Sequence, residues 1–254
     1  MRLIVLVTCF NCEHLIEKTI KSIRSQTYTK FKCFITDDLS TDNSVAVIKD
    51  LIKSDERFTL IVNKEKLSQC GNYDLICRNT ERIKNDDICV EIDGDGDSLI
   101  DENVFNKVIE AYSDNKTWIT NGSFKFISGA NGFSAEIKDF DNLRNLPFTA
   151  SHLRTWKVFL WRALKQEDLK DENGNWIKVG GDLFFFLPML EMAGKYFYQF
   201  FSDITYIYND LNPLNDSKLY MKEVDRMVEL IKIKEKYKPL NVKINRNGEF
   251  KKYL

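Results

Sequence analysis

The first half of the chain alternates short apolar runs with segments of helical periodicity, and this alternation constrains the fold more than any other feature. In the helical segments, at about residues 15–23, 45–52 and 104–112, apolar side chains recur every three or four positions. The apolar runs are Leu3–Val7, Phe31–Thr36, Phe58–Val62 and Ile88–Ile92. Strands separated by helices of this length predict an α/β fold with a mainly parallel, Rossmann-like sheet flanked by helices.

Polar side chains follow three of these runs at the points where the predicted strands end. Thr8–Asn11 follows the first run, Asp37-Asp38 the second, and Asp93–Asp97 the fourth. In parallel sheets, ligands bind at the carboxyl ends of the strands. We therefore expect these three clusters to lie together and to form a ligand-binding site.

The third cluster places Asp93, Asp95 and Asp97 at alternate positions directly after a buried strand. Repelling charges at a strand end are costly unless a cation or a polyhydroxyl ligand compensates them. Carboxylate oxygens suit Mg²⁺ or Mn²⁺. An EF-hand calcium loop is excluded because Ser98 and Val104 occupy the positions that need Gly and Glu. A solvated acidic turn remains an alternative.

Composition excludes several classes of protein. The 254 residues carry 37 Lys and Arg against 38 Asp and Glu, so bulk charge gives no case for nucleic-acid binding. No apolar run reaches the length of a transmembrane segment, and the N-terminal run is interpreted as a strand, not a signal peptide. Cys9 and Cys12 form a CxxC without a second pair, so we interpret the six cysteines as reduced structural thiols, with metal or redox chemistry as the alternative. Reduced thiols predict a cytoplasmic location.

The second half of the chain has a different pattern. Residues 121–150 are rich in loop-forming residues, and Leu153–Leu164 is predicted to be an amphipathic helix. Asp171–Asn175 resembles the start of a calcium loop, but Trp176 occupies the Gly position, so we predict a turn. Gly180-Gly181-Asp182 precedes an apolar helix over Leu183–Ala193. From about Leu219 we predict a charged amphipathic helix and a solvated basic end, with a peripheral membrane contact as the alternative.

Several of these segments together resemble a known family. Val7–Asn11, Ser22–Tyr28 and Ile35–Asp42 are similar to the start of family 2 glycosyltransferases of the GT-A fold, and the acidic run resembles their DxD motif. Ser151–Lys157, Gly181–Gly194 and Tyr208–Asp216 resemble a subgroup of small bacterial and viral members. The resemblance implies a GT-A domain over residues 1–218, with a nucleotide-sugar-binding half (1–115) and an acceptor and catalytic half (116–218), followed by a helical tail (219–254).

The resemblance also implies an activity: the inverting transfer of a sugar from a UDP-sugar to a hydroxyl group of a glycan or protein, dependent on Mn²⁺ or Mg²⁺. Asp182 would be the general base, which takes the proton of the acceptor hydroxyl. Asp95 and Asp97 would hold the metal ion, which stabilises the leaving diphosphate. Thr8 and Asp38 would hold the base and Asp93 would approach the ribose. The implied nucleotide-binding residues are Thr8, Phe10, Asn11, Asp38, Asp93 and Gly94.

Four further residues, Asn121, His152, Arg154 and Trp156, are candidates to face the donor or the acceptor, with packing in the interior as the alternative. Two departures from the family pattern matter. The segment Asp93–Leu99 has one added residue and lacks the usual Trp, so the roles of Asp95 and Asp97 could be exchanged. Ser217 stands where relatives often carry a His.

Two other functions stay open at this point. One is a protein of the same fold that binds nucleotide sugars with weak or no catalysis, which the lost Trp and His favour. The other is a nucleotidyltransferase. It is disfavoured because residues 8–14 contain no Gly, Lys or Arg for a phosphate loop. For a viral chain, the predicted location would be the host cytoplasm.

Overall fold

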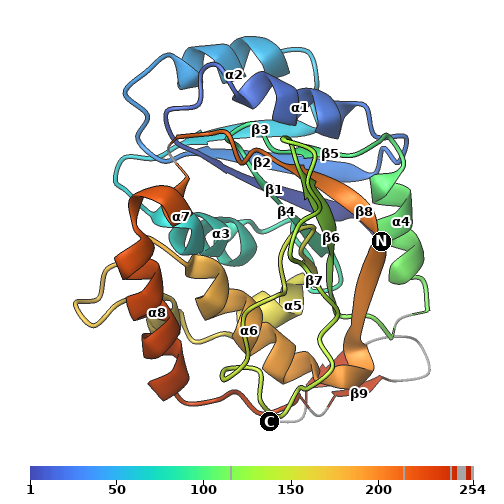
Figure 1. The fold of residues 1–254 in the computed structure, drawn as a ribbon. Coiled ribbons are helices and arrows are strands. Elements are labelled where there is room, and N and C mark those ends of the chain that lie inside the picture. The colour runs from blue at the N-terminus through green and yellow to red at the C-terminus, as the bar shows by residue number, and fades with distance from the viewer. Residues whose placement is uncertain (115, 214, 241, 245–249, 253–254) are drawn as a thin grey trace.

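The computed structural model describes residues 1–114, 116–213, 215–240, 242–244 and 250–252. Its first half forms a parallel sheet in the order β3-β2-β1-β4, with a helix in each connection between consecutive strands (Figure 1). These elements are β1 (Leu3–Cys9), α1 (Ile16–Arg24), β2 (Phe31–Asp37), α2 (Ser44–Ile52), β3 (Phe58–Val62), α3 (Ser68–Asn79) and β4 (Ile88–Asp93). The predicted α/β fold is confirmed. Helix α3 was not predicted from the sequence.

The second half extends this sheet to eight strands in the order β3-β2-β1-β4-β7-β6-β8-β5. β7 pairs antiparallel with both β4 and β6, β5 pairs antiparallel with β8, and β6 pairs parallel with β8. Over the described residues the sheet is therefore mixed, with four successive parallel strands, β3-β2-β1-β4, on one side. The added elements are β5 (Ser98–Leu99), α4 (Val104–Ala111), β6 (Ile119–Phe126), β7 (Thr155–Lys157), α5 (Val158–Ala163), α6 (Gly181–Ala193) and β8 (Tyr198–Tyr208).

Both faces of the sheet are covered, which explains why β1 is apolar throughout. Leu3, Val5 and Val7 pack in a core with residues of α1, α2 and α4. Ile4 and Leu6 point to the opposite face and belong to a core with residues of α3, α5 and α6. Figure 1 shows α1 and α2 above the sheet, and α3, α5 and α6 below it.

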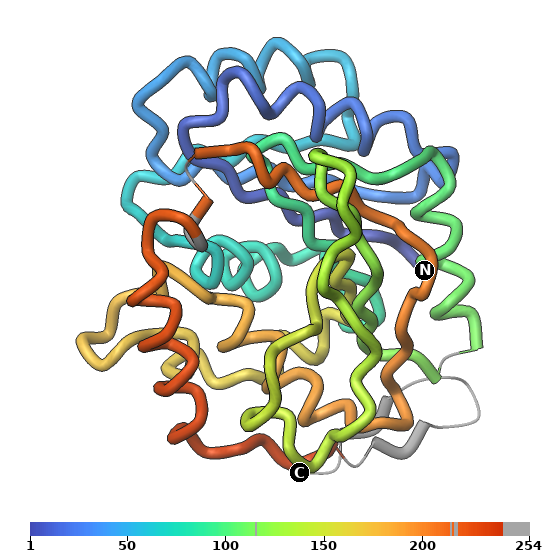
Figure 2. Tube along the Cα trace, in the orientation of Figure 1, coloured from blue at the N-terminus to red at the C-terminus, as the bar shows by residue number. Residues whose placement is uncertain are grey.

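The structure corrects two expectations for the middle of the chain. Residues 153–164 do not form one helix, because Thr155–Lys157 pairs with β4 and β6 as strand β7 before α5 begins. The loop-rich segment 121–150 begins within β6. Figure 2 shows the chain turning back after β6, and Phe126 N donates to Ala130 O at 2.8 Å across this turn. As predicted, Asp171–Asn175 is a turn, in which Asp171 Oδ1 accepts from the backbone N–H of Asn173 and Asn175.

Over its described residues, the expected helical tail is helical only at its start. α7 (Asp216–Leu219) and α8 (Met221–Ile233) precede β9 (Val242–Ile244) and β10 (Phe250–Lys252), which form a small antiparallel sheet. α8 packs on the core through Met227 and Ile231. The rest of the predicted basic end, at residues 241, 245–249 and 253–254, lies outside the described residues. None of the helices described here is long and apolar enough to cross a membrane.

A buried arginine joins α8 to α6. Arg144 donates from Nε and Nη2 to the two carboxylate oxygens of Glu191 on α6, at 2.7 and 2.8 Å. Its Nη1 also donates to the carbonyl oxygens of Ile231 and Lys234, at 2.8 and 2.6 Å. The guanidinium thus satisfies carbonyl groups at the end of α8 that have no partner within the helix.

Candidate functional site

The predicted clusters meet at one edge of the sheet because β1, β2 and β4 are parallel neighbours. Thr8 pairs with Thr36 on one side and with Asp93 on the other. After Asp93 the chain turns tightly at Gly94, whose N–H donates to Thr8 O at 2.9 Å. A Cβ at position 94 would lie only 2.6 Å from that carbonyl oxygen, so the close approach requires glycine. Gly94 therefore serves to bring the acidic run against β1.

Asp97 is fully buried and is held by the end of β8. The Tyr206 hydroxyl donates to Asp97 Oδ2 at 2.7 Å, and the N–H of Asn209 donates to Oδ1 at 2.6 Å. The same hydroxyl accepts from the backbone N–H of Asp93 at 3.1 Å. Burial, and then the charge of Asp95, raise the pKa of Asp97 well above its usual value. A buried carboxylate with this pKa favours a nearby cation.

Asp95 occupies a different position from the other two acids. Its Oδ2 accepts from Asn212 Nδ2 at 2.8 Å, and its carbonyl oxygen accepts from Asn209 Nδ2 at 2.8 Å. Its Oδ1 is buried and has no hydrogen-bond partner among the described residues. Burial raises the pKa of this carboxyl group as well.

Three side chains come close enough to share a metal ion: Asp93, Asp97 and His152, whose potential ligand atoms all lie within 4.8 Å of one another. His152 Nε2 is 3.8 Å from Asp93 Oδ2. Burial, and then the charge of Arg154, lower the pKa of His152 well below its usual value, so its imidazole is neutral. Burial and the neighbouring acids Glu91, Asp97 and Asp95 raise the pKa of Asp93. This donor set fits a divalent cation, and it contains Asp97 in place of Asp95.

Arg154 connects the end of β4 with the start of α6. Its buried guanidinium donates from Nη1 to Glu91 Oε1 at 3.0 Å and from Nη2 to Asp182 Oδ2 at 2.6 Å, while Nε donates to Ala150 O at 2.8 Å. Glu91 is fully buried, and burial is the main cause that raises its pKa to about 7. Asp182 lies in the first turn of α6, after Gly180, and its side chain is 25% exposed. The Asp182 carboxylate is therefore accessible to solvent and is oriented by its hydrogen bond with Arg154.

Two predicted nucleotide-binding residues hold loops in place. Asp38 accepts from Asn63 Nδ2 and from the backbone N–H of Leu67 and Ser68, at 2.9, 2.8 and 3.0 Å. Asn11 Oδ1 accepts from the N–H of Thr41 at 2.8 Å. These bonds order the loops that surround the carboxyl ends of β1, β2 and β3.

Phe10, in contrast, offers an open aromatic surface beside these loops. It follows β1 and is 42% exposed. The Lys66 ammonium lies 3.3 Å from the centre of its ring. Such a ring is available to a planar ligand once Lys66 moves aside.

Asn121 and Trp156 lie in the packed interior, which corrects the expectation that they face a ligand. Asn121 is fully buried, accepts from the Tyr198 hydroxyl at 2.7 Å and donates to Ser134 Oγ at 3.2 Å. Trp156 is fully buried among aromatic rings that include Tyr73 and Phe185. Of the four candidates, His152 and Arg154 lie at the site.

Sequence reasoning missed three residues that hold Asp95 and Asp97, namely Tyr206, Asn209 and Asn212. The last two fall in segments that entered the family resemblance, but no role was predicted for them. Glu91 carried a visible signal, a charged residue inside an apolar strand.

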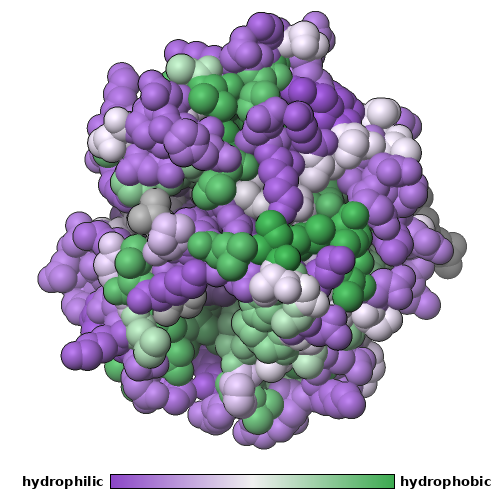
Figure 3. Space-filling view, turned by 45° about the horizontal axis from the view of Figure 1, so that its top comes forward, coloured by the Kyte–Doolittle hydropathy of each residue, from purple (hydrophilic) through white to green (hydrophobic). Residues whose placement is uncertain are grey.

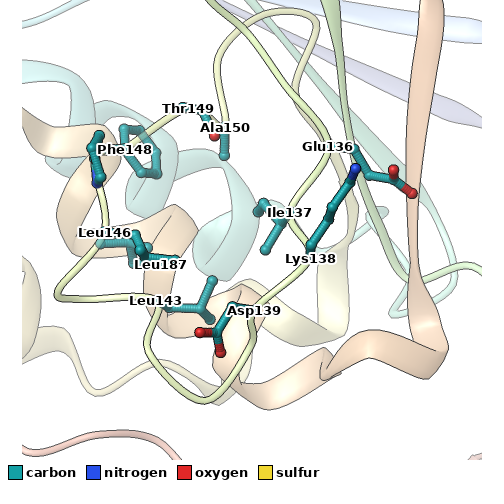
Figure 4. Close-up of a pocket in the computed structure, with 11 residues that line it drawn as sticks. Glu136, Ile137, Lys138, Asp139, Leu143, Leu146, Phe148, Thr149, Ala150 and Leu187 are labelled. Atoms are coloured by element: carbon teal, nitrogen blue, oxygen red, sulfur yellow. The ribbon is translucent and has the colours of Figure 1, made fainter.

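Two cavities border this region. One, of about 210 Å³, lies between the loop 136–150 and α6. Figure 4 shows Ile137 and Lys138 on one side of it, and Leu146 and Phe148 on the other. The other cavity, of about 340 Å³, is lined by residues that include Lys66, Ser68 and Trp176. The space-filling view shows a recess on the displayed face, with polar and hydrophobic atoms around it (Figure 3).

Comparison with known proteins identifies related sequences. The model of a family described as Glycosyl transferase family 2 matches residues 4–160. The chain is 36% identical over 63 residues to a GalNAc(5)-diNAcBac-PP-undecaprenol beta-1,3-glucosyltransferase from Campylobacter jejuni, and 35% identical over 63 residues to an uncharacterized glycosyltransferase from Haemophilus influenzae. Each match covers 25% of this chain and only 20% of the relative's length.

Solved structures share the fold at low sequence identity. Residues 1–349 of TarS from S. aureus, in complex with UDP-GlcNAc, align with a TM-score of 0.68 and 13% identity, over 91% of this chain and 66% of that one. The mannosyltransferase PcManGT from Pyrobaculum calidifontis, in complex with GDP-Man and Mn²⁺, aligns with a TM-score of 0.55 and 14% identity, over 82% of this chain and 56% of that one.

Proposed function

The chain belongs to glycosyl transferase family 2, and we propose that it transfers a sugar from a UDP-sugar to a hydroxyl group of a glycan or protein, with inversion at the sugar carbon. The observation that carries this proposal is the pairing of Asp182 with Arg154, which also binds Glu91 on the strand that leads to Asp93. A solvent-accessible carboxylate is thereby fixed next to the edge of the sheet where ligands bind.

The nucleotide would lie over the carboxyl ends of β1 and β2. Asp38 Oδ2 accepts a hydrogen bond from the N–H of Ser68, and a carboxylate oxygen has capacity for a second, such as one from the N–H of a uracil ring. Phe10 offers an exposed ring beside this position. The fold shared with a TarS structure that binds UDP-GlcNAc supports a UDP-sugar donor.

The acidic run would hold a Mn²⁺ or Mg²⁺ ion. The residues fit such an ion, because burial raises the pKa of Asp93, Asp95 and Asp97 together, and Asp95 Oδ1 is buried without a partner among the described residues. When bound, the ion would neutralise negative charge on the leaving diphosphate. The shared fold of a mannosyltransferase in complex with Mn²⁺ is consistent with this requirement.

Asp182 would act as the general base. The acceptor oxygen attacks the sugar carbon, the bond from that carbon to the UDP oxygen breaks, and the acceptor proton passes to the Asp182 carboxylate. Arg154 Nη2 donates to Asp182 Oδ2 at 2.6 Å, which orients the carboxylate before the transfer.

The test is incubation of the protein with UDP-sugars and Mn²⁺ and measurement of released UDP. In Asp182→Asn we expect UDP affinity and melting temperature close to those of the parent, with kcat lower by roughly 10²–10⁴-fold. Asp203→Asn, at an exposed position on β8, is the matched control. Retained turnover in the Asp182 variant would remove this residue from the mechanism. Binding of UDP-sugars without UDP release by the parent would instead support a nucleotide-sugar-binding protein.

A further inference from the structure

His152 is a buried histidine whose ring nitrogens are not accounted for by packing. The side chain is only 6% exposed, and its ring stacks on that of Tyr206 with centroids 4.5 Å apart and an angle of 7°. Its Nδ1 is buried and has no hydrogen-bond partner among the described residues. Buried polar atoms almost always have a partner, and an unsatisfied one costs about 1–3 kcal/mol. The other ring nitrogen, Nε2, is 3.8 Å from Asp93 Oδ2, which is too long for a hydrogen bond, so this contact does not satisfy the ring either.

The acids around His152 provide the other half of a metal site. Asp93 Oδ2 is 3.8 Å from His152 Nε2, and each residue of the group Asp93, Asp97 and His152 offers one atom within 4.8 Å of the others. Opposite ligands of an ion of the size of Mg²⁺ lie about 4 Å apart, so these atoms need to approach by less than about 1 Å. Asp97 Oδ2 accepts from the Tyr206 hydroxyl and Oδ1 from the N–H of Asn209, and each oxygen has a further lone pair for one more interaction.

We propose that His152 is a ligand of the divalent ion, together with Asp93 and Asp97. This inference rests on the proposed function for the presence of an ion, and it adds a nitrogen donor to the carboxylates of the acidic run. The chain has two histidines, of which His152 is buried and His14 is exposed. An imidazole ligand favours transition metals, whereas an all-oxygen site also suits Mg²⁺. The site should therefore prefer Mn²⁺ to Mg²⁺.

The experiment measures nitrogen coordination directly, by pulsed electron paramagnetic resonance of Mn²⁺ bound to the untagged protein. We expect echo modulation from a directly bound imidazole ¹⁴N, which changes to the ¹⁵N pattern when the protein is grown with ¹⁵N-histidine. His152→Phe, which keeps a ring against Tyr206, should abolish the modulation. It should also lower Mn²⁺ affinity by about ten-fold or more in calorimetry, with a smaller effect on Mg²⁺ affinity. His14→Asn, at an exposed position, should behave like the parent.

Several outcomes separate the two proposals. Mn²⁺ bound by the parent protein without nitrogen modulation overturns the role of His152, whatever the variants do, and so does modulation that persists in His152→Phe. The same preparations are assayed for UDP release from UDP-sugars. UDP release without nitrogen modulation overturns this inference alone, whereas nitrogen modulation without any turnover overturns the proposed function alone.

Discussion

Glu91 should make the stability of the protein depend on pH in a way that one substitution reveals. Its carboxyl group is fully buried, and its pKa rises from 4.5 to about 7 in the folded protein. The folded state therefore binds this proton more tightly than the unfolded state. The contribution of Glu91 to stability is full below pH 4.5 and is lost as the pH rises to 7.

The size of the effect follows from the two pKa values. A shift of this size corresponds to about 3 kcal/mol, of which about 2.5 kcal/mol falls between pH 5 and pH 8. Glu91→Gln cannot ionise, yet its amide oxygen can still accept from Arg154 and Gln69, as Glu91 Oε1 does. Relative to the parent, we therefore expect the variant to gain about 2.5 kcal/mol of unfolding free energy over this pH interval.

Urea unfolding of both proteins at pH 5, 6, 7 and 8, with EDTA to remove metal ions, measures this difference. Glu110→Gln, at an exposed position on α4, is the control and should run parallel to the parent. Parallel pH profiles for the parent and Glu91→Gln would refute the argument, because they would show that Glu91 has the same pKa in the folded and unfolded states.

Three further predictions concern stability and order. Arg144→Met should lower the unfolding free energy by about 3–5 kcal/mol in urea titrations, because Glu191 keeps a buried charge without its partner; a loss below 1 kcal/mol would contradict this reading. Gly94→Ala should lower it by about 1–3 kcal/mol, since the new methyl group would press on Thr8 O, and an unchanged melting temperature would contradict the contact. Asp38→Ala should accelerate amide hydrogen exchange at Leu67 and Ser68, which lose their acceptor, while exchange in α1 stays as in the parent.

The sequence correctly predicted those helices and strands whose formation depends mainly on the burial of apolar side chains. The apolar runs and helical periods located β1 to β4, α1, α2 and α6, because these elements bury continuous or one-sided apolar surfaces. α3 was missed because its buried face includes Asn72 and Asp74, polar side chains whose partners lie elsewhere in the fold. β7 was mistaken for part of a helix because only its pairing with β4 and β6 makes it a strand.

The site shows the same limit. The meeting of three polar clusters followed from the parallel order of β1, β2 and β4. The hydrogen-bond partners of each side chain did not follow from that order, because they lie on loops that come from distant parts of the sequence. Asp38 accepts hydrogen bonds from the backbone N–H groups of Leu67 and Ser68. Asp97 accepts them from the Tyr206 hydroxyl and the N–H of Asn209. No local pattern distinguishes Asp97 from Asp95.

The arginine that joins α6 to the end of α8 also bears on how short a chain can fold. The resemblance to relatives places the end of the domain near residue 218, but Arg144 and Glu191 bind backbone groups of Ile231, Lys234 and Tyr237. A chain that stops at 218 would leave a buried ion pair without these hydrogen bonds, at the opposite end of the helix whose first turn holds Asp182. We therefore expect the smallest chain that folds on its own to extend at least to Tyr237, with residues 219–237 as part of the domain instead of an appendage.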